Sequence, residues 1–114
     1  MRKIEQWMVD TIQAQRITNQ QTLMADGVTN TNDNMMVCTR MRDDRKIVTT
    51  IYLYGNLIAS YSGGEWGFKM CGFPTQTTKS RINAIANAFG RDGVHTKSGK
   101  HYSGNKEVND YDWF

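Results

Sequence analysis

The sequence has no apolar run that approaches the roughly 20 residues a helix needs to cross a lipid bilayer. Its first residues, Met1 to Trp7, are basic, but neither an apolar stretch nor a small-residue cleavage site follows them. A secretory signal requires both features. We therefore expect a cytoplasmic protein that makes no contact with a membrane.

Cysteine is scarce. The chain has only Cys38 and Cys71, each within an apolar, strand-like segment, and they do not form a closely spaced pair. A zinc site would need two further ligands from distant parts of the chain, and cytoplasmic thiols are usually kept reduced. We interpret both cysteines as small buried hydrophobic residues, and we expect no metal and no cofactor.

The sequence also lacks a catalytic motif. A cysteine nucleophile needs a base within hydrogen-bond reach, and Cys71 with His95 or His101 is the pairing available, without any local signature around the cysteine. A metal site made of the two histidines and Asp92 has no stronger support, because cross-strand histidines are also ordinary surface residues. We therefore expect a protein that binds rather than catalyses.

The net charge is only +3, but it is unevenly distributed. Residues 66–106 contain seven basic residues and one acidic residue, a net charge of +6, which leaves −3 for the rest of the chain. A chain with this distribution presents a basic portion to its partner more readily than its total charge suggests.

The length of 114 residues and the hydrophobic content of 39% predict one α+β domain, residues 1–114, without repeats. Apolar residues at helical spacing predict an N-terminal helix over residues 2–16. A polar loop is expected over residues 17–34. Glycine-containing turns between apolar runs predict a four-stranded antiparallel meander, with strands 35–41, 46–54, 57–62 and 65–71.

After the meander, Thr75 or Thr77 caps a second predicted helix, which ends at Gly90 and packs on the sheet. A final β-hairpin is expected from residues 94–97 and 101–103, and residues 107–114 form an acidic, aromatic tail. Trp66, Phe68 and Met70 share one strand face, and we expect them to pack beneath the second helix.

The start of the second helix and the final hairpin form the first candidate site. Free backbone N–H groups, hydroxyls and basic side chains meet there, which suits a phosphate group. The segment lacks the glycine-rich loop of a nucleotide-binding motif. The residues expected to contact nucleic acid are Thr77, Thr78, Lys79, Arg81, Lys97 and Lys100.

Exposed aromatic residues form the second candidate site. Aromatic side chains are enriched where proteins bind other proteins. The residues expected to contact a protein partner are Tyr52, Tyr54, Tyr111, Trp113 and Phe114. For Trp113 and Phe114 the competing expectation is that they fold back onto the domain, since large apolar side chains favour burial.

The segment Gly72-Phe73-Pro74-Thr75-Gln76-Thr77-Thr78-Lys79, which follows a glycine hairpin and precedes a short helix, resembles a pattern in small uncharacterised accessory proteins of tailed bacteriophages. The resemblance covers roughly residues 50–103. It implies a phage origin and action in the host-cell cytoplasm, and it brings no established activity. Small phage proteins often bind host machinery.

Two functions follow as hypotheses. The first is a phage-type, non-enzymatic accessory protein that binds nucleic acid through the basic helix start and hairpin. The alternative is an inhibitor that binds a host protein, such as a defence or nucleic-acid enzyme, through exposed aromatic and charged residues.

Overall fold

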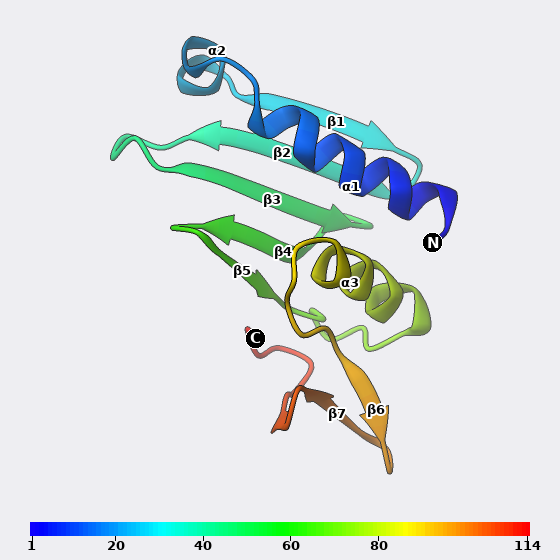
Figure 1. Cartoon of the computed structure of the whole chain (residues 1–114). Helices are drawn as coiled ribbons and strands as arrows, with labels where there is room; N and C mark the ends of the chain where they lie inside the picture. Colours follow the sequence, from blue (N-terminus) through cyan, green and yellow to red (C-terminus); the bar gives the residue numbers. More distant parts are fainter.

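Two helices cover one face of an antiparallel sheet in the computed structural model, which describes residues 1–114 (Figure 1). The five strands of this sheet pair in chain order. They are β1 (Val28–Asn32), β2 (Met35–Met41), β3 (Ile47–Leu53), β4 (Asn56–Ser62) and β5 (Glu65–Phe68). Helices α1 (Lys3–Arg16) and α3 (Gln76–Ala88) lie over the same face, and the short α2 (Gln20–Ala25) connects α1 to β1.

The core fills the space between the helices and the sheet. Met8 and Ile12 of α1 and Ile82 and Ile85 of α3 are fully buried in it, as their helical spacing predicts. The strands contribute Val37, Ile51, Phe68 and Trp66, among others. The expected burial of Trp66, Phe68 and Met70 is confirmed.

The meander has one strand more than expected, because the predicted polar loop over residues 17–34 contains α2 and β1. The side chain of Asn19 accepts a hydrogen bond from the Thr22 amide and caps α2, while Leu23 is buried. Strand β1 pairs along its whole length with β2, although four of its five residues are exposed. The sequence of β1 shows no apolar alternation, because its side chains are not buried and the strand is stabilised by hydrogen bonds to β2.

The turns follow the glycines. Gly55, Gly63 and Gly64 all have positive φ, as the tight turns between antiparallel strands require. Thr75 caps α3 by accepting a hydrogen bond from the Thr78 amide at 3.2 Å, and the helix ends before Gly90, where φ is 72°. The predicted limits of α3 are thus confirmed.

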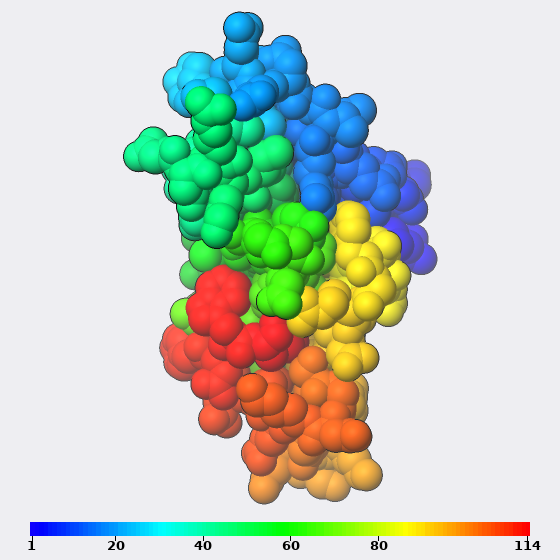
Figure 2. All heavy atoms as spheres, turned by 60° about the vertical axis from the view of Figure 1, so that its left-hand side comes forward, coloured from blue at the N-terminus to red at the C-terminus, as the bar shows by residue number.

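A second, smaller sheet projects from the body beyond α3 (Figure 1). It contains β6 (His95–Lys97), β7 (Lys100–Ser103) and β8 (Lys106–Glu107), so the expected hairpin has a third strand. We call residues 94–107 the arm. The arm forms one end of a molecule that measures 48 × 29 × 23 Å along its principal axes (Figure 2).

The C-terminal tail folds back onto β5. The amide of Phe114 donates to the Phe68 carbonyl at 2.9 Å, and the Phe68 amide donates to the Phe114 carbonyl at 2.8 Å.

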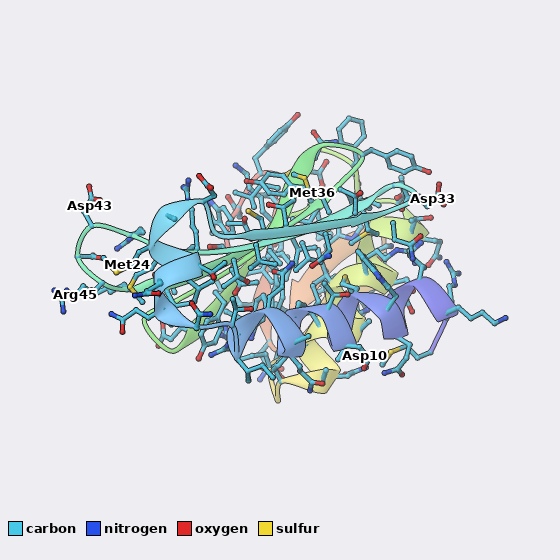
Figure 3. The ribbon with its side chains drawn as sticks, turned by 90° about the horizontal axis from the view of Figure 1, so that it is seen from above. Asp10, Met24, Asp33, Met36, Asp43 and Arg45 are labelled. Atoms are coloured by element: carbon cyan, nitrogen blue, oxygen red, sulfur yellow. The ribbon has the colours of Figure 1, made fainter.

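The far face of the sheet has no helix on it, and Figure 3 shows Met36 pointing away from α1 on that side. None of the helices combines the length and the hydrophobicity that a membrane span requires.

Candidate nucleic-acid interface

The four residues predicted at the start of α3 occupy different environments. Thr78 is buried, and its hydroxyl lies 3.2 Å from that of the capping residue Thr75. Arg81 is only 6% exposed. Thr77 and Lys79 are half-buried. Of this group, therefore, only Lys79 offers an accessible charge to a ligand.

Arg81 is buried because it pairs with Glu5 of α1. Its Nη1 lies 2.8 Å from Glu5 Oε2, and the Ser80 hydroxyl donates to the same oxygen. The expectation that Arg81 binds phosphate does not hold, since its charge is already neutralised inside the protein. Glu5, which the helical pattern places on the polar face, is instead 4% exposed.

The electrostatics of this buried pair follow from its contacts. Burial alone raises the pKa of Glu5, but hydrogen bonds from Ser80 and Arg81 and the positive charge of Arg81 outweigh it. The pKa of the Glu5 carboxyl therefore lies below its ordinary value, and the pair stays ionised at neutral pH. The Glu5–Arg81 pair is thus a structural tie between α1 and α3.

The arm carries exposed lysines with no acidic partner. Lys97 and Lys100 face each other across the turn at Ser98 and Gly99, both of which have positive φ. Lys106 lies on β8, next in the same small sheet. The two salt bridges in the structure are Arg42–Asp44 and Arg81–Glu5, so none of these lysines is neutralised by a direct ion pair.

Lys79 joins the helix start to the arm. Its Nζ donates to the Thr96 hydroxyl at 2.8 Å, and the same hydroxyl lies 3.1 Å from His101 Nδ1. This contact places Lys79 beside the three lysines of the arm, and we call the four together the arm surface. Its members are Lys79, Lys97, Lys100 and Lys106.

The other three bases of the basic segment have structural contacts elsewhere. Arg91 Nη1 donates to the Trp66 carbonyl at 2.6 Å, Lys69 lies 5.7 Å from the ring centre of Trp113, and Arg81 is paired with Glu5. The arm surface therefore holds four of the seven basic charges of the segment, and of the other three Arg91 is also exposed while Lys69 is half-buried.

A polar hollow of about 690 Å³ lies between α1, α3 and β6. Its lining residues include Lys79, Asn83, His95, Glu5 and Ser80. The hollow separates the arm from the helical layer and gives the lysine-bearing side of α3 a concave approach.

The predicted aromatic site is dispersed. Tyr52 is half-buried on β3, and Phe114 packs against the core. Tyr54 is 72% exposed at the turn after β3, whereas Tyr111 is 71% and Trp113 is 45% exposed on the tail. Of the two expectations for the tail, folding back is confirmed for Phe114.

The structure provides no contact that activates a cysteine. The Cys71 thiol donates to the Leu57 carbonyl at 2.7 Å, and no hydrogen bond links it to either histidine. Burial raises the pKa of the Cys71 thiol, with a smaller opposing effect from the charge of Lys69, so the reactive thiolate is disfavoured. Both cysteines are free, and no group of three or more metal-ligating side chains lies together.

Sequence reasoning missed two parts of the arm. Lys106 contributes to the basic charge of the segment but is not among the predicted site residues. The predicted hairpin has two strands, whereas Lys106 lies on a third strand, β8. His95 and Tyr102 stack with ring centres 5.8 Å apart, because they pair directly across β6 and β7.

These features define a small α+β protein with a helix-covered sheet and a separate basic arm. The chain belongs to the Kyanoviridae Gp96 protein family, a family of bacteriophage proteins, whose model matches residues 1–114. The phage origin expected from the resemblance is confirmed. No curated protein and no solved structure matches the chain.

Proposed function

We propose that this phage protein binds nucleic acid through the arm surface and acts by binding rather than by catalysis. The observation that carries the proposal is the placement of Lys97 and Lys100 directly opposite each other at the arm tip. Like charges that face each other across a sheet are destabilising. A polyanion bound at the tip offsets this repulsion, because its phosphates pair with both ammonium groups.

The surroundings of the tip support a phosphate ligand. Lys79 and Lys106 add two further positive charges to the same end of the molecule. The neighbouring acids are Asp92, whose carboxylate lies beside Gly104, and Glu107, which pairs with Tyr102. Four lysines against two acids leave this end positive, and its projection from the body makes it accessible (Figure 2).

We expect Lys97→Glu/Lys100→Glu to lower the affinity for labelled oligonucleotides at least tenfold, measured by fluorescence anisotropy at several salt concentrations. The affinity of the unaltered protein should fall as salt rises, because each phosphate contact releases condensed counterions. Each lysine lost should reduce the slope of log K against log salt by about 0.7–0.9.

Lys3→Glu/Lys46→Glu is the matched control, since it makes the same change of charge on α1 and on the turn between β2 and β3, where both residues are exposed. An equal loss of oligonucleotide affinity in the control would show that the effect depends on net charge alone and not on the position of the lysines. Absence of binding at low salt for the unaltered protein would contradict the proposal.

The alternative function is inhibition of a host protein through exposed aromatic residues. The exposure of Tyr111 and Trp113 on the tail favours it. Tyr111→Ala/Trp113→Ala should then abolish capture of a protein from host lysate while oligonucleotide binding is unchanged. Side-chain substitution is preferable to deletion here, because the backbone of Phe114 pairs with Phe68.

A further inference from the structure

An apolar cavity of about 270 Å³ lies at the other side of the first turn of α3. Leu53, Ile58 and Met70 are its buried apolar residues. The exposed rings of Tyr54 and Phe73 line its rim, at 72% and 55% exposure. This volume lies just below the range of about 300–1,000 Å³ for drug-sized ligands, so the cavity has room for a single ring system.

Tyr54 reaches the rim in a strained backbone conformation. Tyr54 and Gly55 form the two-residue turn between β3 and β4, and Tyr54 has a φ of 50°. Such turns prefer asparagine, aspartate or glycine, because other side chains are strained at positive φ. An exposed aromatic ring at this position therefore carries a conformational penalty.

Phe73 reaches the rim in a similar way. The two residues before it, Cys71 and Gly72, have φ values of 57° and 77°. This left-handed pair turns the chain at the end of the sheet, just before α3 begins. Both rim aromatics thus depend on backbone conformations that ordinary residues avoid.

The cavity and the polar hollow that reaches the arm lie on opposite sides of the first turn of α3. Thr75, Thr77 and Thr78 line the apolar cavity, whereas Gln76 and Lys79, one residue away on the same turn, line the polar hollow that reaches the arm. One helical turn therefore separates a lysine from an apolar slot. The side chains of Asn56 and Thr77 also line the cavity and are free of hydrogen bonds within the protein, so they are available to a polar ring edge.

We propose that this cavity accepts one unpaired base of a single strand whose phosphates lie along the arm surface. The assignment rests on the proposed function and names its ligand class. Bases stack well on aromatic side chains, and Lys79, on the same turn of α3, can pair with a phosphate next to the base. Paired bases within a duplex are stacked on each other and cannot enter, so the cavity selects single strands.

The test compares three labelled probes of equal length by fluorescence anisotropy: a single strand, the same backbone with abasic sites throughout, and a duplex. The abasic probe keeps every phosphate and removes every base. We expect the single strand to bind about tenfold more tightly than the abasic probe, since one stacked base contributes of this order. The duplex should bind no more tightly than the abasic probe.

Tyr54→Asn and Phe73→Ala should each remove the preference for the base-bearing strand and leave abasic binding unchanged. Asparagine suits the positive φ at residue 54, so Tyr54→Asn retains the turn. Met24→Ala is the control, because Met24 is as exposed as Phe73 (55%) and does not line the cavity.

Equal binding of the single strand and the abasic probe would overturn the base site and leave nucleic-acid binding by the arm intact. A preference that survives both cavity substitutions would also overturn it. Failure of all three probes to bind at low salt would instead overturn the proposed function.

Discussion

Glu5 and Arg81 form a buried ion pair, which gives two charged residues a structural role. The two charged residues lie 76 positions apart along the chain, yet both are almost fully buried, with Arg81 Nη1 2.8 Å from Glu5 Oε2. An isolated buried charge is very costly, whereas a paired and hydrogen-bonded one is tolerated. The pair therefore ties α1 to α3 without adding to the surface charge.

We expect Glu5→Gln to lower the free energy of unfolding by about 3–5 kcal/mol at neutral pH, because the substitution leaves Arg81 buried without a counter-charge. Urea denaturation measures this change. Glu5→Met/Arg81→Met, which removes both charges, should be closer to the unaltered protein than Glu5→Gln is.

The same pair predicts a pH dependence. The pKa of Glu5 is lower in the folded protein than its ordinary value of 4.5, so its stabilisation is present above about pH 4.5 and is lost as pH falls through the folded value. Glu5→Gln should lose less stability than the unaltered protein over this acid range. An identical acid profile in both proteins would contradict the assignment.

The arm depends on one side chain of α3 for its attachment. Asn83 Nδ2 donates to the Val94 carbonyl at 3.0 Å, and Asn83 Oδ1 accepts from the Val94 amide at 2.7 Å. This double contact satisfies both backbone groups of the residue that precedes β6. A Cβ at Gly93 would collide with the Asn83 side chain, so glycine is required there for the close approach.

We expect Asn83→Ala to accelerate hydrogen exchange of the arm amides, residues 94–107, and to weaken oligonucleotide binding several-fold. The reason is that a looser arm must lose more conformational freedom when it binds. Global stability should fall by about 1–3 kcal/mol, the cost of two lost hydrogen bonds. Asn87→Ala, an exposed position on the same helix, is the control. Unchanged exchange in the arm would contradict this role.

At the scale of the whole molecule, the chain end closes one edge of the large sheet. The reciprocal hydrogen bonds between Phe114 and Phe68 extend the sheet beyond β5, and the Phe114 ring lies 6.0 Å from that of Phe68. The opposite edge, β1, is polar and exposed. An edge covered by the tail and an edge made of polar residues both disfavour edge-to-edge association.

Deletion of Trp113 and Phe114 should lower the free energy of unfolding by about 2–4 kcal/mol, through two lost backbone hydrogen bonds and the lost burial of one aromatic ring. Thermal denaturation followed by circular dichroism measures it. Trp113→Ala alone should cost less, since that ring is 45% exposed. Equal stability of the deletion and the full chain would show that the tail does not complete the sheet.

The sequence by itself determined the elements whose signals lie within a few residues. Helical spacing predicted α1 and α3, and glycines that adopt positive φ predicted the turns at Gly55 and Gly63 and hence the order of four strands. The exposed lysines of the arm tip also followed from the sequence, because a glycine turn between polar residues is a local feature.

Only the tertiary structure decided which charges are available. Arg81 is buried by a partner 76 positions away, and β1 is a strand because β2 supplies its hydrogen bonds. The apolar cavity forms where the turn at Tyr54 meets the segment before α3. Such contacts join distant parts of the chain. Local sequence patterns do not predict them, because many long-range pairings are compatible with the same pattern and the packing of the core determines which one forms.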